Sequence, residues 1–175
     1  MSSKPGAAQD AFLFDTTVLS IYLDPNHPQH IAKGQSLAAL PAENPRFVSP
    51  VALGELGFGT RLASLIGKGD PARLNAILAE ARAYAVLDIT HHTASAYAEL
   101  KSKVAHKYLA KTLRQDRPKY IEDWIDKATG QKLAIDENDL WMCAQAKERD
   151  LVFVTADARM KRIPDADAEV RLLIV

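Results

Sequence analysis

A length of 175 residues is typical of one domain with a buried core of its own. A single cysteine, Cys143, excludes an internal disulfide framework and a cysteine-rich zinc site. The 22 Lys and Arg residues balance the 22 Asp and Glu residues, which argues against nucleic-acid binding through overall positive charge but leaves local patches open.

Residues 1–10 are small or polar, and we expect a flexible N-terminal tail followed by a single domain over residues 11–175. This tail lacks the apolar core of a signal peptide. No apolar run in the chain approaches the roughly 18 residues that a membrane-spanning helix needs. We therefore expect a cytoplasmic protein.

From residue 11 onward, short apolar runs alternate with longer amphipathic stretches, which is typical of an α/β fold with a mainly parallel sheet. Strands are expected at Ala11–Phe14, Arg46–Val48, Val86–Ile89, Leu151–Val154 and Arg171–Val175. Helices are expected at Thr17–Leu23, Pro28–Leu40, Pro50–Ile66, Pro71–Tyr84, Thr93–Leu113, Lys119–Lys127 and Asn138–Arg149. Proline is tolerated in the first turn of a helix, which favours several of these starting points.

Two acidic residues lie at or just past the ends of expected strands. Asp15 follows the first strand, and Asp157 follows the fourth. Ligands of an open parallel sheet bind beyond the carboxyl ends of its strands, so both carboxylates are candidate site residues. Each is equally well explained as a structural residue, Asp15 as a helix cap and Asp157 as a turn or cap residue.

Two further acids lie in the first turns of expected helices. Glu55 has Val51, Leu62 and Ile66 at helical spacing from it, so we expect it on a mostly buried face, where a carboxylate needs a partner. The alternative is a glutamate that reaches past the core to water. Asp139 heads an apolar stripe of the last helix, and its alternative role is that of another capping acid.

Four carboxylates able to converge at one end of a sheet cannot all ionise without compensation, because each raises the pKa of the others. A divalent cation removes this conflict, and ligands that are all oxygen favour Mg²⁺ or Mn²⁺ over Zn²⁺. Such a site serves phosphodiester hydrolysis by activating a water molecule and stabilising the charge on the transferring phosphate.

Three stretches of the sequence resemble PIN-domain nucleases. They are Phe12–Ser20 (FLFDTTVLS), Ser49–Leu56 (SPVALGEL), and Asn138–Ala146 (NDLWMCAQA) followed by Leu151–Asp157 (LVFVTAD). The last is the most specific and is similar to the C-terminal half of VapC-type toxins, the ribonuclease partners in type II toxin–antitoxin pairs. The acids fall in the order of the family.

This resemblance implies a three-layer α/β/α sandwich with a parallel five-stranded sheet in the order 3-2-1-4-5. It implies a Mg²⁺- or Mn²⁺-dependent endoribonuclease, a homodimer, and neutralisation by a cognate antitoxin. Carried over to the matching positions, it makes Asp15, Glu55, Asp139 and Asp157 the metal-binding, catalytic acids. It also implies that the hydroxyl of Thr155 orients the last acid or a bound water.

The chain departs from the family pattern in two places. Thr17 stands where the family often has Asn or Ser, so a hydroxyl is kept and a methyl is added. A helical insertion is expected around residues 113–133, where minimal members are shorter. It removes none of the four acids, but the resemblance leaves the local geometry there and the surface for a partner open.

Basic residues recur at helical spacing on the helix expected before this insertion, and Arg159 is a further basic residue after the fourth strand. The recurring residues form one stripe, which is either a solvated helix face or a track for the phosphate backbone of RNA. A metal nuclease site nearby favours the RNA track. Its expected members are Lys103, Lys107, Lys111, Arg114 and Arg159.

The sequence as a whole favours a metal-dependent endoribonuclease, the toxin of a toxin–antitoxin pair. One alternative is a phosphatase-like hydrolase in which Asp15 is a covalent nucleophile, although that family expects a second Asp where this chain has Thr17. Another alternative is a PIN-like scaffold that binds RNA or a partner without cutting. The presence of all four acids argues against such a scaffold.

Overall fold

The computed structural model describes residues 10–109 and 118–175. Five parallel strands form one sheet in the order β3-β2-β1-β4-β5, which confirms the order that the family resemblance implied. Phe14 pairs with Val154, so the carboxyl ends of the first and fourth strands lie side by side. The strands are β1 (Phe12–Phe14), β2 (Arg46–Val48), β3 (Ala85–Val86), β4 (Val152–Thr155) and β5 (Arg171–Ile174).

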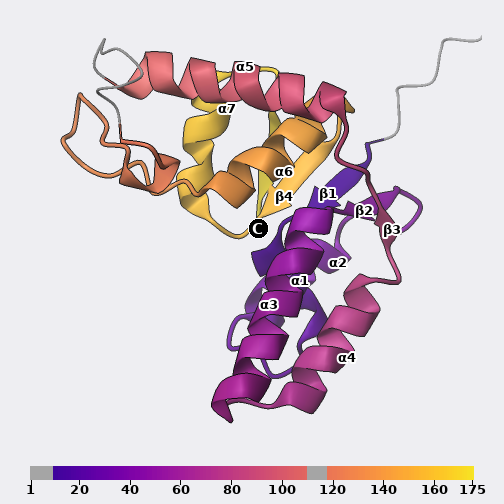
Figure 1. The fold of residues 1–175 in the computed structure, drawn as a ribbon. Coiled ribbons are helices and arrows are strands. Elements are labelled where there is room, and N and C mark those ends of the chain that lie inside the picture. The colour runs from indigo at the N-terminus through magenta and orange to yellow at the C-terminus, as the bar shows by residue number, and fades with distance from the viewer. Residues whose placement is uncertain (1–9, 110–117) are drawn as a thin grey trace, which may run out of the picture.

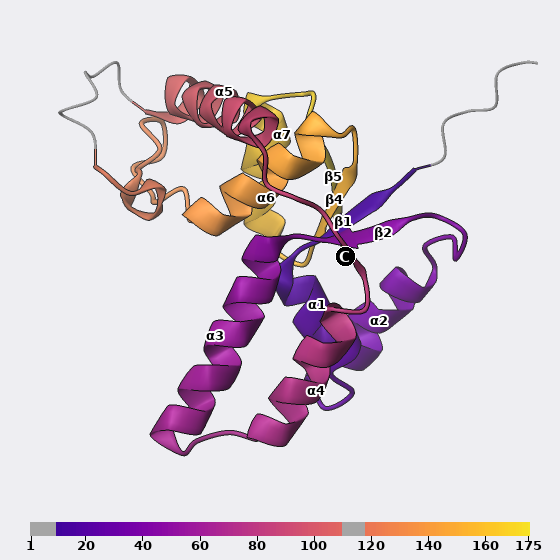
Figure 2. The same cartoon turned by 45° about the vertical axis from the view of Figure 1, so that its right-hand side comes forward.

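Helices cover both faces of the sheet, as Figures 1 and 2 show, and this arrangement confirms the predicted three-layer sandwich. One layer contains α1 (Thr16–Leu23), α2 (His30–Ala38), α3 (Pro50–Ile66) and α4 (Pro71–Ala81). The other contains α5 (His91–Tyr108), α6 (Glu137–Glu148) and α7 (Arg162–Ala166). None of the described helices is long and apolar enough to cross a membrane.

Strands β1 and β4, which are neighbours in the middle of the sheet, are buried on both faces. Leu13, Phe14 and Phe153 are at most 1% exposed, and they pack with Leu140 and Met142 of α6. Strands covered by helices on both sides need continuous rather than alternating apolar residues, which explains the short apolar runs in the sequence. Burial of each large side chain stabilises the fold by about 1.5–3 kcal/mol. The residues that follow β1 and β4 are therefore attached to a rigid platform.

The third strand is shorter than predicted. Residues Val86–Ile89 were expected to be extended, but β3 contains two residues and ends at Val86. The side chain of Gln145 on α6 donates hydrogen bonds to the carbonyl oxygens of Leu87 and Asp88, at 2.9 and 3.3 Å. These side-chain bonds satisfy backbone groups that a longer strand would have used in the sheet.

The described part of the insertion, residues 118–133, does not form the predicted helix over Lys119–Lys127. One turn of 3-10 helix, η2 (Ile121–Asp123), is followed by an antiparallel bridge between Ile125 and Lys132. Gly130 lies in the intervening turn with a φ of 69°, a conformation that glycine adopts without strain and that ends a helix. The prediction of a helix here was wrong. Ile121 and Trp124, which are three residues apart, are both buried, but they lie in and directly after a single 3-10 turn rather than on one face of a helix.

Candidate functional site

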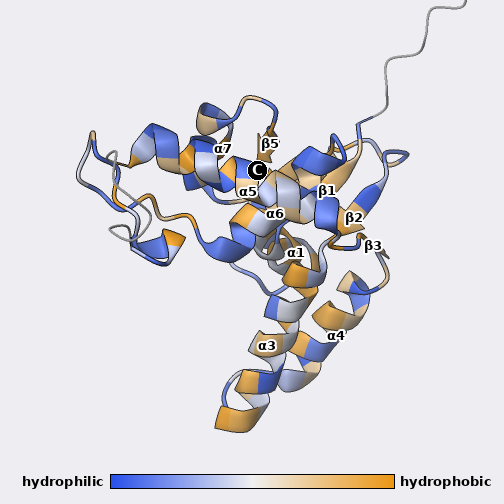
Figure 3. Ribbon diagram, turned by 45° about the horizontal axis from the view of Figure 1, so that its top comes forward, coloured by the Kyte–Doolittle hydropathy of each residue, from blue (hydrophilic) through white to orange (hydrophobic). Residues whose placement is uncertain are grey.

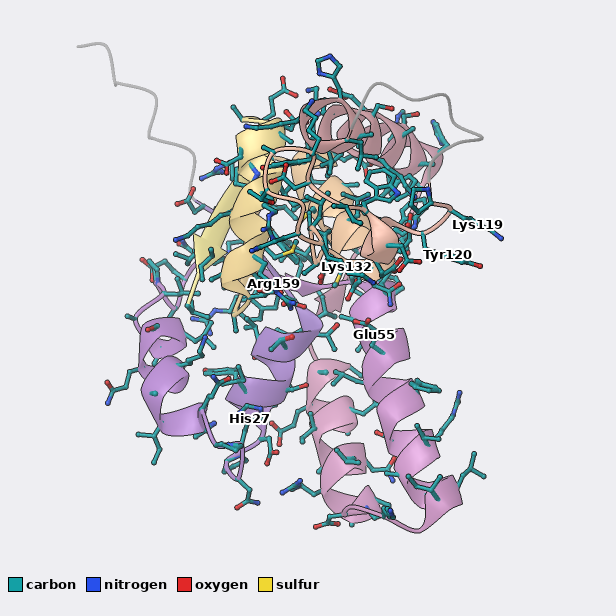
Figure 4. All side chains as sticks on the ribbon, turned by 90° about the vertical axis from the view of Figure 1, so that its left-hand side faces the viewer. His27, Glu55, Lys119, Tyr120, Lys132 and Arg159 are labelled. Atoms are coloured by element: carbon teal, nitrogen blue, oxygen red, sulfur yellow. The ribbon has the colours of Figure 1, made fainter. Side chains whose placement is uncertain are left out.

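A cavity of about 250 Å³ lies where the carboxyl ends of β1 and β4 meet α3 and α6. All four predicted acids line it, and a fifth carboxylate comes from Asp136. Figure 4 shows Glu55 in the first turns of α3 and Arg159 on the segment after β4. The residues of this carboxylate pocket are Asp15, Thr16, Thr17, Glu55, Asp136, Asp139, Asp157 and Arg159.

Asp15 is both a helix cap and a member of the pocket. Its Oδ1 accepts a hydrogen bond from the backbone N–H of Thr17 at 3.3 Å, and its Oδ2 accepts one from the hydroxyl of Thr155 at 2.7 Å. The side chain is only 3% exposed, and this burial raises the pKa of Asp15 to about 6. Thr155 limits the rise in that pKa, because a donated hydrogen bond stabilises the carboxylate.

Asp139 lies in the first turn of α6. Its backbone N–H donates to Oδ1 of Asp136, the N-cap of the helix, at 2.8 Å. Burial raises the pKa of Asp139 to about 8, and the negative charge of Asp15, followed by that of the other pocket acids, adds to the rise. The mutual repulsion expected from the sequence is therefore a property of this pocket.

Glu55 is held by donors from two other helices. The hydroxyl of Thr16 donates to its Oε2, and the amide of Asn138 donates to its Oε1 at 2.7 Å. Neither donor was predicted as a site residue, and the only signal for them was their position next to Asp15 and Asp139 in the sequence. Their bonds fix both oxygens of Glu55 on the side where α1 and α6 meet α3.

The mostly buried face predicted for Glu55 is wrong. Glu55 is half-buried, whereas Leu62 and Ile66 on the same face of α3 are 40% and 56% exposed. Helix α3 extends beyond the sheet, and Figure 3 shows apolar residues at its far end. The partners that Glu55 needs are therefore polar side chains at the pocket rather than a surrounding core.

Asp157 is paired with Arg159. The guanidinium contacts both carboxylate oxygens at 2.6–2.9 Å, and the backbone N–H of Arg159 donates to Oδ1 at 2.8 Å. This pairing lowers the pKa of Asp157. Thr155 connects the two strand-end acids, since its hydroxyl donates to Asp15 and accepts from the backbone N–H of Asp157 at 3.1 Å.

The basic stripe on α5 does not line the carboxylate pocket in the described residues. Lys103 pairs with Glu99 at 2.6 Å and with Asp167 at 3.0 Å, and Lys107 donates to the carbonyl oxygen of Asp165. Both lysines line a separate depression. Lys111 and Arg114 lie outside the described residues, as does part of the insertion. RNA binding by this stripe stays a prediction.

A second group of carboxylates lies between α5 and the start of β5. Glu99, Asp167 and Glu169 are close enough together to hold a metal ion. The ammonium group of Lys147 lies between them, 2.8, 2.6 and 3.0 Å from their oxygens, and Lys103 adds a second positive charge. Two lysines therefore offset most of the negative charge of these three acids. Among the described residues, the carboxylate pocket is the group of acids with the larger excess of negative charge.

Comparisons with known proteins agree with this fold. The sequence model of one family, described as the PIN domain, matches residues 12–166. A search of curated protein sequences found no match.

Several solved structures share the fold. A chain of VapBC2 from Rickettsia felis, solved bound to a DNA fragment from its promoter, superposes with a TM-score of 0.61 at 18% identity, covering 94% of this chain and 98% of that one. A chain of DNA-bound VapBC from Salmonella typhimurium gives 0.60 at 20% identity, over 95% and 98%. A chain of the toxin–antitoxin system VapBC-5 from Mycobacterium tuberculosis gives 0.59 at 21% identity, over 94% and 98%.

Proposed function

Because the chain belongs to the PIN domain family, we propose that the carboxylate pocket binds Mg²⁺ or Mn²⁺ and that the protein is an endoribonuclease. One observation supports this most strongly. Five carboxylates converge at the ends of β1 and β4, with Arg159 as the basic side chain among the described residues that line the pocket. The nuclease activity is what the resemblance to PIN domains implies.

The residues of the pocket fit a hard divalent cation. The available donors are carboxylate oxygens, the ligands that Mg²⁺ and Mn²⁺ prefer. Asp15, Glu55, Asp139 and Asp157 would hold the cation, which would supply Lewis acidity to the attacking water and to the scissile phosphate. The raised pKa values of Asp15 and Asp139 also fit, since a nearby positive charge favours the ionised form of both carboxyls.

The protein's own contribution is to hold these acceptors in place. Thr155 fixes one oxygen of Asp15, while Thr16 and Asn138 fix both oxygens of Glu55. Preorganised groups lose little conformational freedom when a charged ligand arrives, and such preorganisation is a large part of electrostatic catalysis. Arg159 is exposed at the rim, where its guanidinium is suited to a substrate phosphate.

We further propose that the protein is the toxin of a toxin–antitoxin pair, that a cognate antitoxin neutralises it, and that it forms a homodimer. The likeness of nearly the whole chain to chains from VapBC structures supports the antitoxin partner. We expect a small gene next to the gene of this protein. It should encode a DNA-binding protein, the antitoxin, that copurifies with this chain and inhibits it. If this protein cleaves RNA and no such gene lies next to its own, the toxin assignment is wrong.

The function is tested by RNA cleavage with Mg²⁺ or Mn²⁺, comparing the wild-type protein with Asp15→Asn and Asp139→Asn. Loss of either carboxylate is expected to lower the rate on the order of 100-fold or more, and chelation with EDTA is expected to abolish cleavage. Asp150→Asn is a matched control, because Asp150 is exposed outside the pocket and Asn tolerates its φ of 52°.

Three outcomes would contradict the proposal. Full RNA-cleaving activity of Asp139→Asn would show that the carboxylate pocket is not the catalytic site. Hydrolysis of small phosphomonoesters without RNA cleavage would favour Asp15 as a covalent nucleophile. RNA binding without cleavage under any metal condition would favour a non-catalytic scaffold.

A further inference from the structure

Arg159 lies in the carboxylate pocket and places its guanidinium on Asp157. Its Nε is 2.9 Å from each carboxylate oxygen, and its Nη2 is 2.6 Å from Oδ2. Within the described residues, the guanidinium has no hydrogen bond to any other side chain. Both oxygens of one expected metal ligand are therefore occupied by a cation that belongs to the protein.

This pair is built so that it can open. The side chain of Arg159 is 60% exposed, and ion pairs in contact with water are weak because water competes for both charges. Asp157 keeps a second anchor, since the backbone N–H of Arg159 donates to its Oδ1 at 2.8 Å in the 3-10 turn η3 (Ala158–Lys161). That anchor does not depend on the side chain. The guanidinium can leave without displacing Asp157.

The rest of the pocket favours such an exchange. Asp15, Glu55, Asp136 and Asp139 add carboxyl groups around the same cavity, and a divalent cation favours their ionised form. A divalent cation placed among these carboxylates gains more electrostatic stabilisation than one guanidinium at the rim. Once displaced, Arg159 remains at the mouth of the pocket with a planar set of donors that matches a phosphate group.

We propose that Arg159 is an exchangeable counter-ion of the pocket: it covers Asp157 in the metal-free protein, yields Asp157 to the divalent cation, and then binds a phosphate of the RNA. The identity of the cation and of the phosphate rests on the proposed function. The exchange predicts opposite effects of removing this side chain. Metal binding becomes tighter because a competitor is lost, and RNA binding becomes weaker because a phosphate donor is lost.

Calorimetric titration of the RNA-free protein with Mn²⁺ tests the first effect. Arg159→Met is expected to bind Mn²⁺ about two- to tenfold more tightly than the wild type, given the modest strength of an exposed ion pair. Arg159→Lys is expected to lie between them, because an ammonium keeps the charge without the two-pronged contact. No tightening, or a weaker affinity, in Arg159→Met would overturn the proposal.

The affinity for single-stranded RNA tests the second effect. With Ca²⁺ in place of Mn²⁺, so that a divalent ion with the same oxygen ligands is present, fluorescence anisotropy is expected to show a loss of about threefold or more in Arg159→Met. A residue that only supported the turn would change both affinities in the same direction or change neither. Unchanged RNA affinity in Arg159→Met would overturn the second half of the proposal.

Lys161→Met is the matched control. It removes one positive charge from the same 3-10 turn, and in the described structure Lys161 makes no hydrogen bond or ion pair with Asp157. Its Mn²⁺ affinity is expected to stay within about twofold of the wild type. Equal tightening in Lys161→Met and Arg159→Met would indicate a general charge effect and contradict the exchange.

Asp139→Asn separates this inference from the proposed function. If the wild type and Asp139→Asn bind Mn²⁺ equally, or neither binds it, the proposed metal site fails. If Asp139→Asn abolishes binding while Arg159→Met leaves it unchanged, the metal site stands and only the exchange at Asp157 is wrong.

Discussion

Asp15 and Asp139 retain protons at pH values where exposed carboxyl groups have lost them. The pKa of Asp15 is raised to about 6 and that of Asp139 to about 8, in both cases mainly by burial. Folding without a cation therefore places ionisable groups where their charged form is disfavoured. Their position is unfavourable for the stability of the metal-free protein and suited to binding a cation.

These pKa values predict how the stability of the metal-free protein depends on pH. Between about pH 4 and 8 the folded protein binds more protons at Asp139 than the unfolded chain does, so the free energy of unfolding falls as the pH rises. Asp15 contributes in the same direction up to about pH 6. Denaturant unfolding in EDTA is expected to show a loss on the order of 2 kcal/mol between pH 6 and 8.

The Asp139→Asn variant checks the origin of that loss. It keeps the size of the side chain and cannot ionise, so it is expected to remove most of the decline between pH 6 and 8 and to be more stable than the wild type at pH 8. A decline of the same size in the variant would place the titrating group elsewhere.

Single residues of the site differ in how far the sequence could predict them. Asp15 follows β1 directly and Asp157 lies two residues beyond β4, so their place at one edge of the sheet follows from the chain order once the two strands are neighbours. Asn138 and Thr16 could not be predicted as partners of Glu55, because their contacts depend on how α1, α3 and α6 are rotated. The pairing of Asp157 with Arg159 could not be predicted either, because it depends on the side-chain rotamer of Arg159.

At the scale of elements, the pocket depends on the meeting of α3 and α6. Glu55 lies near the start of α3, and the amide of Asn138 in the first turn of α6 donates to it at 2.7 Å. Asn138 is exposed, so it contributes little to the core. Its hydrogen bond positions one acid of the pocket relative to Asp139, which is its neighbour in the chain.

Asn138→Ala is expected to lower RNA cleavage about 3- to 10-fold, because Glu55 loses one of its two side-chain donors. The free energy of unfolding is expected to change by less than about 0.5 kcal/mol, since the residue is exposed. Steady-state cleavage and denaturant unfolding measure the two effects. Asn75→Ala on α4, also exposed, is the control, and an equal loss of activity there would contradict a specific role for Asn138.

Elements with a continuous apolar pattern were predicted well, and the failures have local causes. Strands β1, β2 and β4 lie within a residue or so of their predicted bounds. The helix expected over Lys119–Lys127 failed because Ile121 and Trp124 are buried at a spacing that a turn shares with a helix. Periodicity alone does not distinguish these two conformations when the segment is short.

At the scale of the whole molecule, the zero formal charge conceals an uneven distribution. Two lysines of α5 pair with acids that are distant in the chain: Lys101 lies 2.7 Å from Glu137, and Lys103 lies 3.0 Å from Asp167. These partners are 36 and 64 residues away in the chain, so composition and helical spacing could not reveal them. The carboxylate pocket keeps an excess of negative charge that the described part of the protein does not balance.

The most direct test of the central claim is a crystal structure of the wild-type protein grown with Mn²⁺, with the ion located by its anomalous scattering. We expect density in the carboxylate pocket, about 2.0–2.6 Å from oxygens of Asp15, Glu55, Asp139 or Asp157. An empty pocket at saturating Mn²⁺, or an ion bound only among Glu99, Asp167 and Glu169, would contradict the account.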